Sequence, residues 1–157
     1  WDDRWAAYSE WAVFGEKLRN ELLFLVDEDT RAYDRIIACF SMPKGTDAEK
    51  AARKAAITEA TKGAINTPLR TMQVCVESIK LMQAMAEKGL PASVSDAGVG
   101  ALCARTGAIG GYLNVRINCA GLDDATFKAE VLKEAEALKA MAEALEAEVM
   151  ALTLGKV

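Results

Sequence analysis

The carboxylate of Asp29 has the clearest potential for chemistry in this sequence. At about 100° per residue of a helix, Asp29 shares one face with the apolar residues Leu22, Leu25, Val26, Tyr33, Ile36 and Phe40. A carboxylate on an apolar face is poorly solvated, and such an environment suits a general acid–base. The structural alternative is an ion pair with a lysine or arginine of another helix. Asp29 is therefore a candidate acid–base residue.

A second set of polar residues lies where a later helix is predicted to begin. Ser93, Ser95 and Asp96 lie close together there. The free amides of a helix start attract polar or anionic groups. Such residues also occur as simple helix caps, so the segment predicts either a capped helix or part of a binding site.

Two further sets of side chains can hold a ligand. Asn114 and Asn118 are one helical turn apart, and their amides require either a buried hydrogen-bond network or the edge of a heterocycle. Lys44, Lys50 and Arg53 surround a loop and the first turns of a helix. These cations can hold carboxylates or can simply be solvated.

Composition excludes several kinds of chemistry. The chain has no histidine, which removes Ser-His-Asp and Cys-His catalysis and the commonest transition-metal ligand. We expect no metal site. Its formal net charge is -4, and no basic stripe exists for a nucleic-acid partner. The cysteines form no Cys-x-x-Cys pair and are predicted to be reduced core thiols at Cys39, Cys75, Cys103 and Cys119.

The periodicity of apolar residues predicts an all-α fold, a bundle of about five helices, some of them long. The first covers residues 2–40, as one helix or as two with a bend near Gly15. The others cover residues 46–65, 67–89, 95–119 and 124–154.

Local signals set these boundaries. Thr46 and Glu49 have the spacing of a capping box. Thr67 followed by Pro68 predicts an N-cap before a proline at the first helical position. Ser95 is the predicted cap of the next helix, and Asp123 or Asp124 caps the last helix.

Two seams predict close packing between helices. Apolar residues recur every seven positions in the last helix, at Val131, Leu138, Leu145 and Leu152. Small residues form a stripe in the preceding helix, at Ala97, Gly100, Ala104, Ala108, Gly111 and Val115. We expect more apolar surface than one copy can cover, and hence a homo-oligomer.

The remaining expectations concern the location of the chain. Arg105 and Arg116 interrupt its most apolar stretch, which leaves no run of about 18 apolar residues for a membrane span. The start at Trp1 is not a secretory leader. We expect a cytoplasmic chain without a membrane partner that is the trimmed part of something longer.

Taken together and in order, several segments resemble the cyclodeaminase domain of formiminotransferase-cyclodeaminase and its stand-alone bacterial relatives. The resemblance covers the chain from about Leu22 onward. It rests on Leu25-Val-Asp-Glu-Asp29 with Tyr33, Met42-Pro-Lys-Gly-Thr46 with Glu49-Lys50, Thr67-Pro-Leu69, Ser95-Asp96, and Gly111-Tyr-Leu-Asn-Val115 with Ile117-Asn118.

The resemblance implies a helical homodimer that binds folate in a cleft at or near the dimer contact. It implies conversion of 5-formiminotetrahydrofolate to 5,10-methenyltetrahydrofolate and ammonia, a step of histidine degradation, with no prosthetic group. The residue that matches the family's acid–base is Asp29. The residues implied for substrate binding are Ser95, Asp96, Tyr112 and Asn114 for the pterin and Lys44 or Arg53 for the glutamate tail.

One departure from the family pattern bears on activity. Family members carry a glycine-rich segment before the part matched here, so residues 1–157 are interpreted as a single domain that is incomplete at its N-terminus. A fused formiminotransferase domain is a further possible partner. Two alternatives stay open: a methenyltetrahydrofolate cyclohydrolase on the same scaffold, and a non-catalytic helical dimerisation module.

Overall fold

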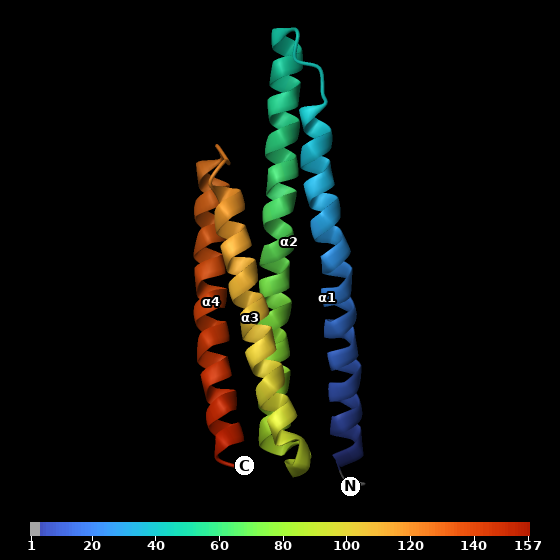
Figure 1. Cartoon of the computed structure of the whole chain (residues 1–157), viewed down its shortest axis with the longest axis vertical. Helices are drawn as coiled ribbons and strands as arrows, with labels where there is room; N and C mark the ends of the chain where they lie inside the picture. Colours follow the sequence, from blue (N-terminus) through green and yellow to red (C-terminus); the bar gives the residue numbers. More distant parts are fainter. Residues whose placement is uncertain (1–3) are drawn as a thin grey trace.

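A computed structural model of the chain describes residues 4–157, and these form four long helices and one short 3₁₀ turn (Figure 1). The all-α prediction is confirmed, and residues 4–157 contain no strand. The predicted helix start at Asp2 lies outside the described residues. The elements are α1 (Trp5–Phe40), α2 (Asp47–Lys88), η2 (Pro91–Ser93), α3 (Val94–Cys119) and α4 (Ala125–Leu154).

The longest helix, α2, is the centre of the arrangement. It packs against α1, α3 and α4, and α3 also packs against α4. In contrast, α1 packs mainly on α2 and lies on the side of α2 away from α4 (Figure 1). The α1–α2 pair extends beyond α3 and α4 at one end (Figure 1). Much of α1 is therefore left without a second helical neighbour.

The predicted break between the second and third helices is wrong, because α2 continues through Pro68. Proline lacks the N–H that would bond to the carbonyl four residues earlier, which is that of Ala64. The Asn118 side-chain amide of α3 donates to the Ala64 oxygen instead, at 2.9 Å. The Thr67 hydroxyl does not cap a new helix but donates to the Gly63 carbonyl at 3.2 Å. A donor from another helix thus supports the proline inside α2.

This support predicts a large effect of changing Asn118. Asn118→Ala leaves the buried carbonyl of Ala64 without its side-chain donor, and it is expected to lower the free energy of unfolding by about 1–3 kcal/mol. Asn114→Ala is the matched control, because Asn114 is exposed and makes only a 3.5 Å contact with the Gly110 carbonyl. We expect a change below about 0.5 kcal/mol for the control. Urea denaturation measures both variants, and equal effects would contradict the assigned role of Asn118.

Most of the other predicted boundaries agree with the structure. The capping box is confirmed, since Thr46 Oγ1 accepts from the Glu49 amide at 3.2 Å and the Glu49 carboxylate accepts from the Thr46 amide at 2.8 Å. Asp124 caps α4 by accepting from the Phe127 amide at 3.1 Å. Ser95 was predicted wrongly as a cap, because the 3₁₀ turn η2 leads directly into α3 and places Ser95 in its first turn.

Both predicted seams are used within the chain. On α4 the seam residue Val131 is buried, and Leu138, Leu145 and Leu152 are partly buried against the core. The neighbouring residues Ala135, Ala142 and Val149 are also buried. The small residues of α3 allow it to approach α2 closely. A β-carbon added at Gly111 would lie 2.7 Å from Met72 Cγ and 2.9 Å from the Pro68 carbonyl oxygen. The bundle core therefore lies between α2, α3 and α4.

The cysteines only partly follow the prediction of core thiols. Cys75 and Cys119 are buried and Cys39 is partly buried, whereas Cys103 is exposed. The prediction is wrong for Cys103 because it lies two helical turns after the exposed Asp96, on the same solvent-facing side of α3. All four are free thiols.

Burial raises the pKa of the Cys75 thiol from 9.0 to about 11. The unfolded chain therefore releases this proton at lower pH than the native protein, so the contribution of Cys75 to stability falls between about pH 9 and 11. We expect a loss approaching about 2 kcal/mol over this range, at roughly 1.4 kcal/mol per pH unit. Urea denaturation at pH 8, 9 and 10 measures the slope, which Cys75→Ala should reduce. An unchanged slope in that variant would assign the pH dependence to other groups.

Candidate functional site

Asp29 lies at the edge of an apolar, solvent-exposed flank of α1. The apolar face predicted around it is divided in the structure: Leu25 is buried against α2, whereas Val26 and Tyr33 are 66% and 62% exposed. Asp29 itself is exposed, and no hydrogen bond or ion pair joins it to another residue in 4–157. Within one chain, Asp29 is thus neither half-buried nor part of a structural ion pair.

The direction in which Asp29 points can be inferred from a pocket nearer the N-terminal end of α1. Trp11 and Asp29 are 18 residues apart, about five full turns, so both point from the same face. Trp11 lines a pocket of 430 Å³ between α1, α2 and the segment that leads into α3, with Gly15, Met82 and Ser93 among its other lining residues. Asp29 therefore faces the side of α1 on which α3 lies, roughly 27 Å farther along the helix.

Residues of α3 lie on the flank of that helix that is nearer α1. Asp96 and Asn114 are also 18 residues apart and exposed. Gly107 points in nearly the same direction around the α3 axis as Asp96 and Asn114, and a β-carbon added there would contact Cys75 of α2. Arg105 points in the opposite direction and approaches Glu146 of α4. Asp96 and Asn114 thus lie on the flank of α3 away from α4, which is the flank nearer α1 (Figure 1).

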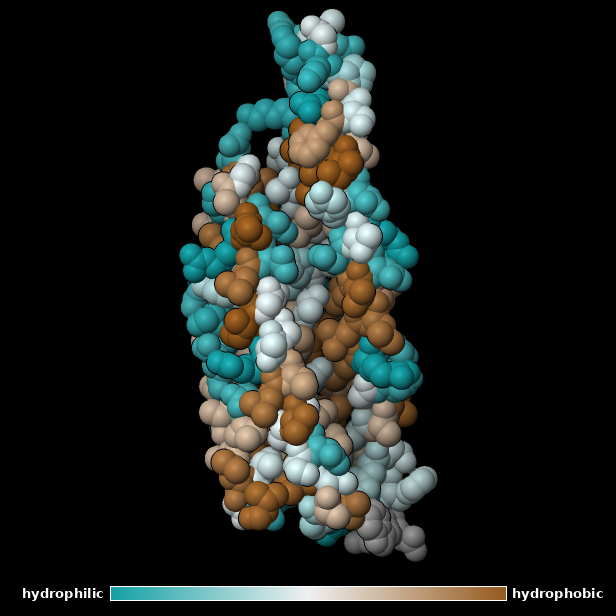
Figure 2. Space-filling view, in the orientation of Figure 1, coloured by the Kyte–Doolittle hydropathy of each residue, from teal (hydrophilic) through white to brown (hydrophobic). Residues whose placement is uncertain are grey.

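We call this surface the α1–α3 face. Hydrophobic side chains lie on both helices in the space-filling view (Figure 2). Its exposed apolar residues are Val26, Tyr33, Ile37 and Phe40 of α1 and Val99, Leu113 and Ile117 of α3, with the polar residues Asp29, Asp96 and Asn114 among them. The structure therefore places an exposed carboxylate of α1 and an exposed amide of α3 on one largely apolar face.

The structure does not bring all the predicted residues together. Ser95 and Asp96 lie in the first turn of α3, and Asp96 is about 27 Å from the level of Asn114 along the helix. Asp29 lies toward the opposite end of the bundle, because Cys39 and Phe40 farther along α1 contact Arg53 near the start of α2. One copy of the chain thus separates Ser95 and Asp96 from Asp29.

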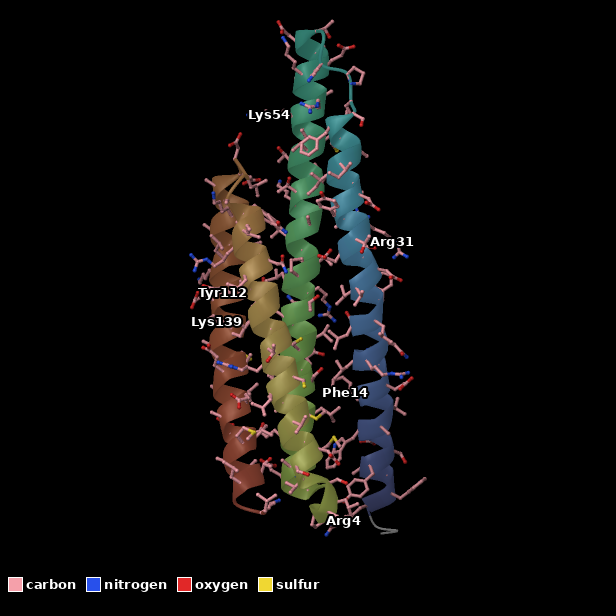
Figure 3. The ribbon with its side chains drawn as sticks, viewed as in Figure 1. Arg4, Phe14, Arg31, Lys54, Tyr112 and Lys139 are labelled. Carbon is pink, nitrogen blue, oxygen red and sulfur yellow. The ribbon has the colours of Figure 1, made fainter. Side chains whose placement is uncertain are left out.

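Tyr112 faces α4 rather than the α1–α3 face. It is only 8% exposed, and its hydroxyl donates to the Glu136 carboxylate and accepts from Arg116 Nη1 at 3.0 Å. The Lys139 ammonium lies 5.7 Å from the centre of the Tyr112 ring, and Figure 3 shows both residues on the side of the bundle away from α1. The hydrogen-bonding capacity of Tyr112 is thus used in joining α3 to α4.

Lys44 and Arg53 lie in a third region, at the start of α2. Arg53 Nε and Nη2 each donate to carbonyls at the end of α1, those of Cys39 and Phe40, at 3.3 Å. Lys44 is exposed in the preceding loop. Both residues line a pocket of 330 Å³ that also includes Lys50 and Lys54. Lys54 was not among the basic residues predicted from the sequence to lie together. Its position one helical turn after Lys50 was the one feature that could have indicated it.

Two further features of the described residues bear on other functions. No group of three or more cysteine, aspartate or glutamate side chains within 4–157 has the arrangement of a metal site. None of the helices over these residues combines the length and apolarity needed to cross a bilayer.

Comparison with known proteins relates this arrangement to a family. A family model described as formiminotransferase-cyclodeaminase matches residues 2–137. The chain belongs to this family. The resemblance seen in the sequence is confirmed, and the match includes Asp29, Asn114 and the basic pocket at the start of α2.

Relatives in the family carry two different names. Methenyltetrahydrofolate cyclohydrolase of Methylorubrum extorquens is 46% identical over 130 residues, which are 83% of this chain and 62% of that protein. Formimidoyltransferase-cyclodeaminase of Sus scrofa is 34% identical over 118 residues, which are 75% of this chain and 22% of that protein. The chain thus spans about three fifths of the first relative and about a fifth of the second.

A solved structure shows the same fold. The crystal structure of formiminotetrahydrofolate cyclodeaminase from Thermotoga maritima, at 2.80 Å resolution, matches with a TM-score of 0.77 and 24% identity. The match covers 89% of this chain and 66% of that chain. This family member therefore has the cyclodeaminase fold.

Proposed function

We propose that this chain belongs to an enzyme that acts on the one-carbon bridge of tetrahydrofolate, and that its reaction is hydrolysis of 5,10-methenyltetrahydrofolate. The observation that carries this choice is the 46% identity to a methenyltetrahydrofolate cyclohydrolase. The cyclodeaminase reaction is the one that the resemblance of the sequence implies. It stays the second candidate, because relatives named formimidoyltransferase-cyclodeaminase match at 32% to 39% identity.

The two reactions make similar demands on a protein. In the hydrolysis, water adds to the methenyl carbon and loses a proton, and one carbon–nitrogen bond opens to leave a formyl group on the other nitrogen. In the cyclodeamination, N10 attacks the formimino carbon, loses its proton, and ammonia leaves. Each reaction requires a group that removes a proton from the nucleophile and protonates a leaving nitrogen, which one carboxylate can do. We assign this role to Asp29.

The exposure of Asp29 in a single chain is consistent with a site that a second copy completes. An acid–base residue works best when it is shielded from bulk water, and the surroundings of Asp29 on the α1–α3 face are apolar. We infer that a homodimer contact covers this face and forms the folate cleft there. Contributions from both copies would also account for the separation of Ser95 and Asp96 from Asp29 along one chain.

The remaining assignments follow from this arrangement. Asn114 is the residue of α3 on this face with an amide suited to a pterin edge. Ser95 and Asp96 are assigned to the pterin through the second copy. Tyr112 acts indirectly, by holding α3 against α4. Lys44 and Arg53 are assigned to the glutamate tail of the substrate. The tetrahydrofolate derivative is the substrate, and the proposal includes no prosthetic group.

The experiment follows the absorbance of the methenyl group with the full-length protein and each of the two substrates. Loss of the absorbance of 5,10-methenyltetrahydrofolate faster than the enzyme-free rate would support the cyclohydrolase. Formation of that absorbance from 5-formiminotetrahydrofolate, with release of ammonia, would support the cyclodeaminase. Absence of both activities in a folded oligomer would instead support the non-catalytic dimerisation module.

A further inference from the structure

Tyr33 presents an aromatic ring to solvent on the α1–α3 face, beside Asp29. Its side chain is 62% exposed, and no hydrogen bond, ion pair or ring contact joins it to another residue of the described chain. An aromatic ring combines a large apolar area with an electron-rich face. Because no part of its own chain covers the ring of Tyr33, both properties are available to a ligand.

The helix places the Tyr33 ring over the turn that carries Asp29. The two residues are four positions apart in α1, so their β-carbons lie about 5–6 Å apart on one face. Side chains of a helix lean toward its N-terminal end, and the ring of Tyr33 therefore covers the preceding turn. The exposed apolar residues Val26 and Ile37 border the pair. A ligand that contacts the face of the ring is thus within reach of the Asp29 carboxylate.

Two other aromatic residues of α1 lie within about three turns of Asp29, and both differ from Tyr33. The ring of Phe40 lies 5.7 Å from the guanidinium of Arg53 and so already has a cationic partner. Phe24 is exposed, but it precedes Tyr33 by nine residues, which turns it to the opposite side of the helix. Tyr33 is therefore the aromatic residue of α1 that combines a free ring face with a position next to Asp29.

The reacting group of both candidate substrates is a flat cation. In 5,10-methenyltetrahydrofolate one positive charge is shared between N5 and N10 across the bridge carbon, and a protonated formimino group is an amidinium with the same charge. The face of a tyrosine ring attracts a cation that lies within about 6 Å of its centre. Hydrolysis removes this charge, because the formyl group of the product is neutral. A free ring face beside the acid–base therefore matches the charge of the reacting group itself.

We propose that the Tyr33 ring binds the cationic one-carbon group of the folate by a cation–π contact, next to the Asp29 carboxylate that transfers the proton. The proposal rests on the proposed function. It makes Tyr33 a substrate-binding residue that distinguishes a charged one-carbon group from a neutral one. In the hydrolysis the formyl product lacks the charge, so the same contact favours the binding of substrate over that of product.

The test compares a cationic and a neutral folate on the full-length protein. Rapid-mixing fluorescence gives Kd for 5,10-methenyltetrahydrofolate before it is hydrolysed, and calorimetry gives Kd for 5-formyltetrahydrofolate, whose one-carbon group is neutral. In Tyr33→Leu we expect Kd of the methenyl compound to rise about five- to thirtyfold, the range of a cation–π contact shielded from water. Kd of the formyl compound should rise less than about threefold. Tyr33→Phe retains a ring, so both values should stay within about threefold of those of the unmodified protein.

Phe24→Leu is the matched control for these titrations. It removes another exposed ring of α1 from the opposite side of the helix, and it should leave both affinities unchanged. Four results would each overturn the proposal: no binding of the methenyl compound by the unmodified protein, equal losses for the charged and the neutral folate in Tyr33→Leu, an equal loss in Phe24→Leu, or a loss in Tyr33→Phe as large as that in Tyr33→Leu. Dissociation of Tyr33→Leu into single copies would assign Tyr33 to the dimer contact and would also overturn it.

Turnover gives a second readout. KM for the methenyl compound should rise in Tyr33→Leu while kcat falls by no more than about twofold, because the ring binds the substrate and transfers no proton. Asp29→Asn should show the reverse, a loss in kcat. A loss confined to kcat in Tyr33→Leu would contradict the binding role. If the unmodified protein binds the folates but turns over neither candidate substrate, the proposed function fails, and the titrations still decide whether Tyr33 contacts the cationic group.

Discussion

Asp29→Asn is expected to reduce turnover by about 10²–10⁴-fold, the usual contribution of a general acid–base. Asparagine has nearly the same shape as aspartate but cannot accept and return a proton. Because Asp29 is exposed and has no bonded partner in the described chain, the variant should fold normally. Initial rates with both folate substrates measure the effect, and size-exclusion chromatography verifies the oligomer.

Asp34→Asn provides the control for this prediction. Asp34 is another exposed aspartate of α1, and its position five residues after Asp29 directs it to a different side of the helix. The control changes the charge by the same amount on the same helix and should retain full turnover. If Asp29→Asn retained more than about a tenth of the activity, a value outside the range for a proton-transfer residue, the acid–base role would belong to another group.

Gly111→Ala is expected to lower the free energy of unfolding by about 2–3 kcal/mol through overpacking. The new β-carbon would lie 2.7 Å from Met72 Cγ and 2.9 Å from the Pro68 carbonyl oxygen. The Met72 side chain can move, but the Pro68 oxygen belongs to the backbone of α2. The helix must therefore shift at the site where Asn118 supports it, and this strain should exceed the gain of up to about 1 kcal/mol from replacing a helical glycine.

Gly110→Ala is the matched control and should have the opposite sign. Apart from the adjacent backbone of α3 itself, no atom of the described residues lies within 4 Å of a β-carbon added at Gly110. Gly110 is also exposed. The helix should be stabilised by about 0.5–1 kcal/mol. Chemical denaturation compares the adjacent variants, and a similar gain in both would show that α3 does not approach α2 as closely as the structure indicates.

The structure confirms the sequence predictions that depend on neighbouring residues. The capping box of Thr46 and Glu49 and the cap at Asp124 join groups three residues apart. The small-residue stripe of α3 and the seam of α4 follow the helical repeat, which places their residues on one face whatever the partner helix is. Spacing alone was therefore sufficient to locate these elements.

The break at Pro68 was predicted wrongly because the compensating donor is not local. Asn118 is 54 residues from Ala64, the residue whose carbonyl it bonds. The same limit applied to the basic pocket, since Asp123 lies beside Lys54 only once α3 and α4 have packed on α2. Local patterns do not contain this information.

For the candidate site, the sequence by itself determined the family, the apolar neighbours of Asp29 on the helix and the basic residues before and within the start of α2. Only the tertiary structure decided that Asp29 is exposed on the α1–α3 face, that Tyr112 faces α4, and that Ser95 and Asp96 lie far from Asp29. The physical reason is that a helical repeat defines which residues share a face, whereas the packing of whole helices determines which faces are covered.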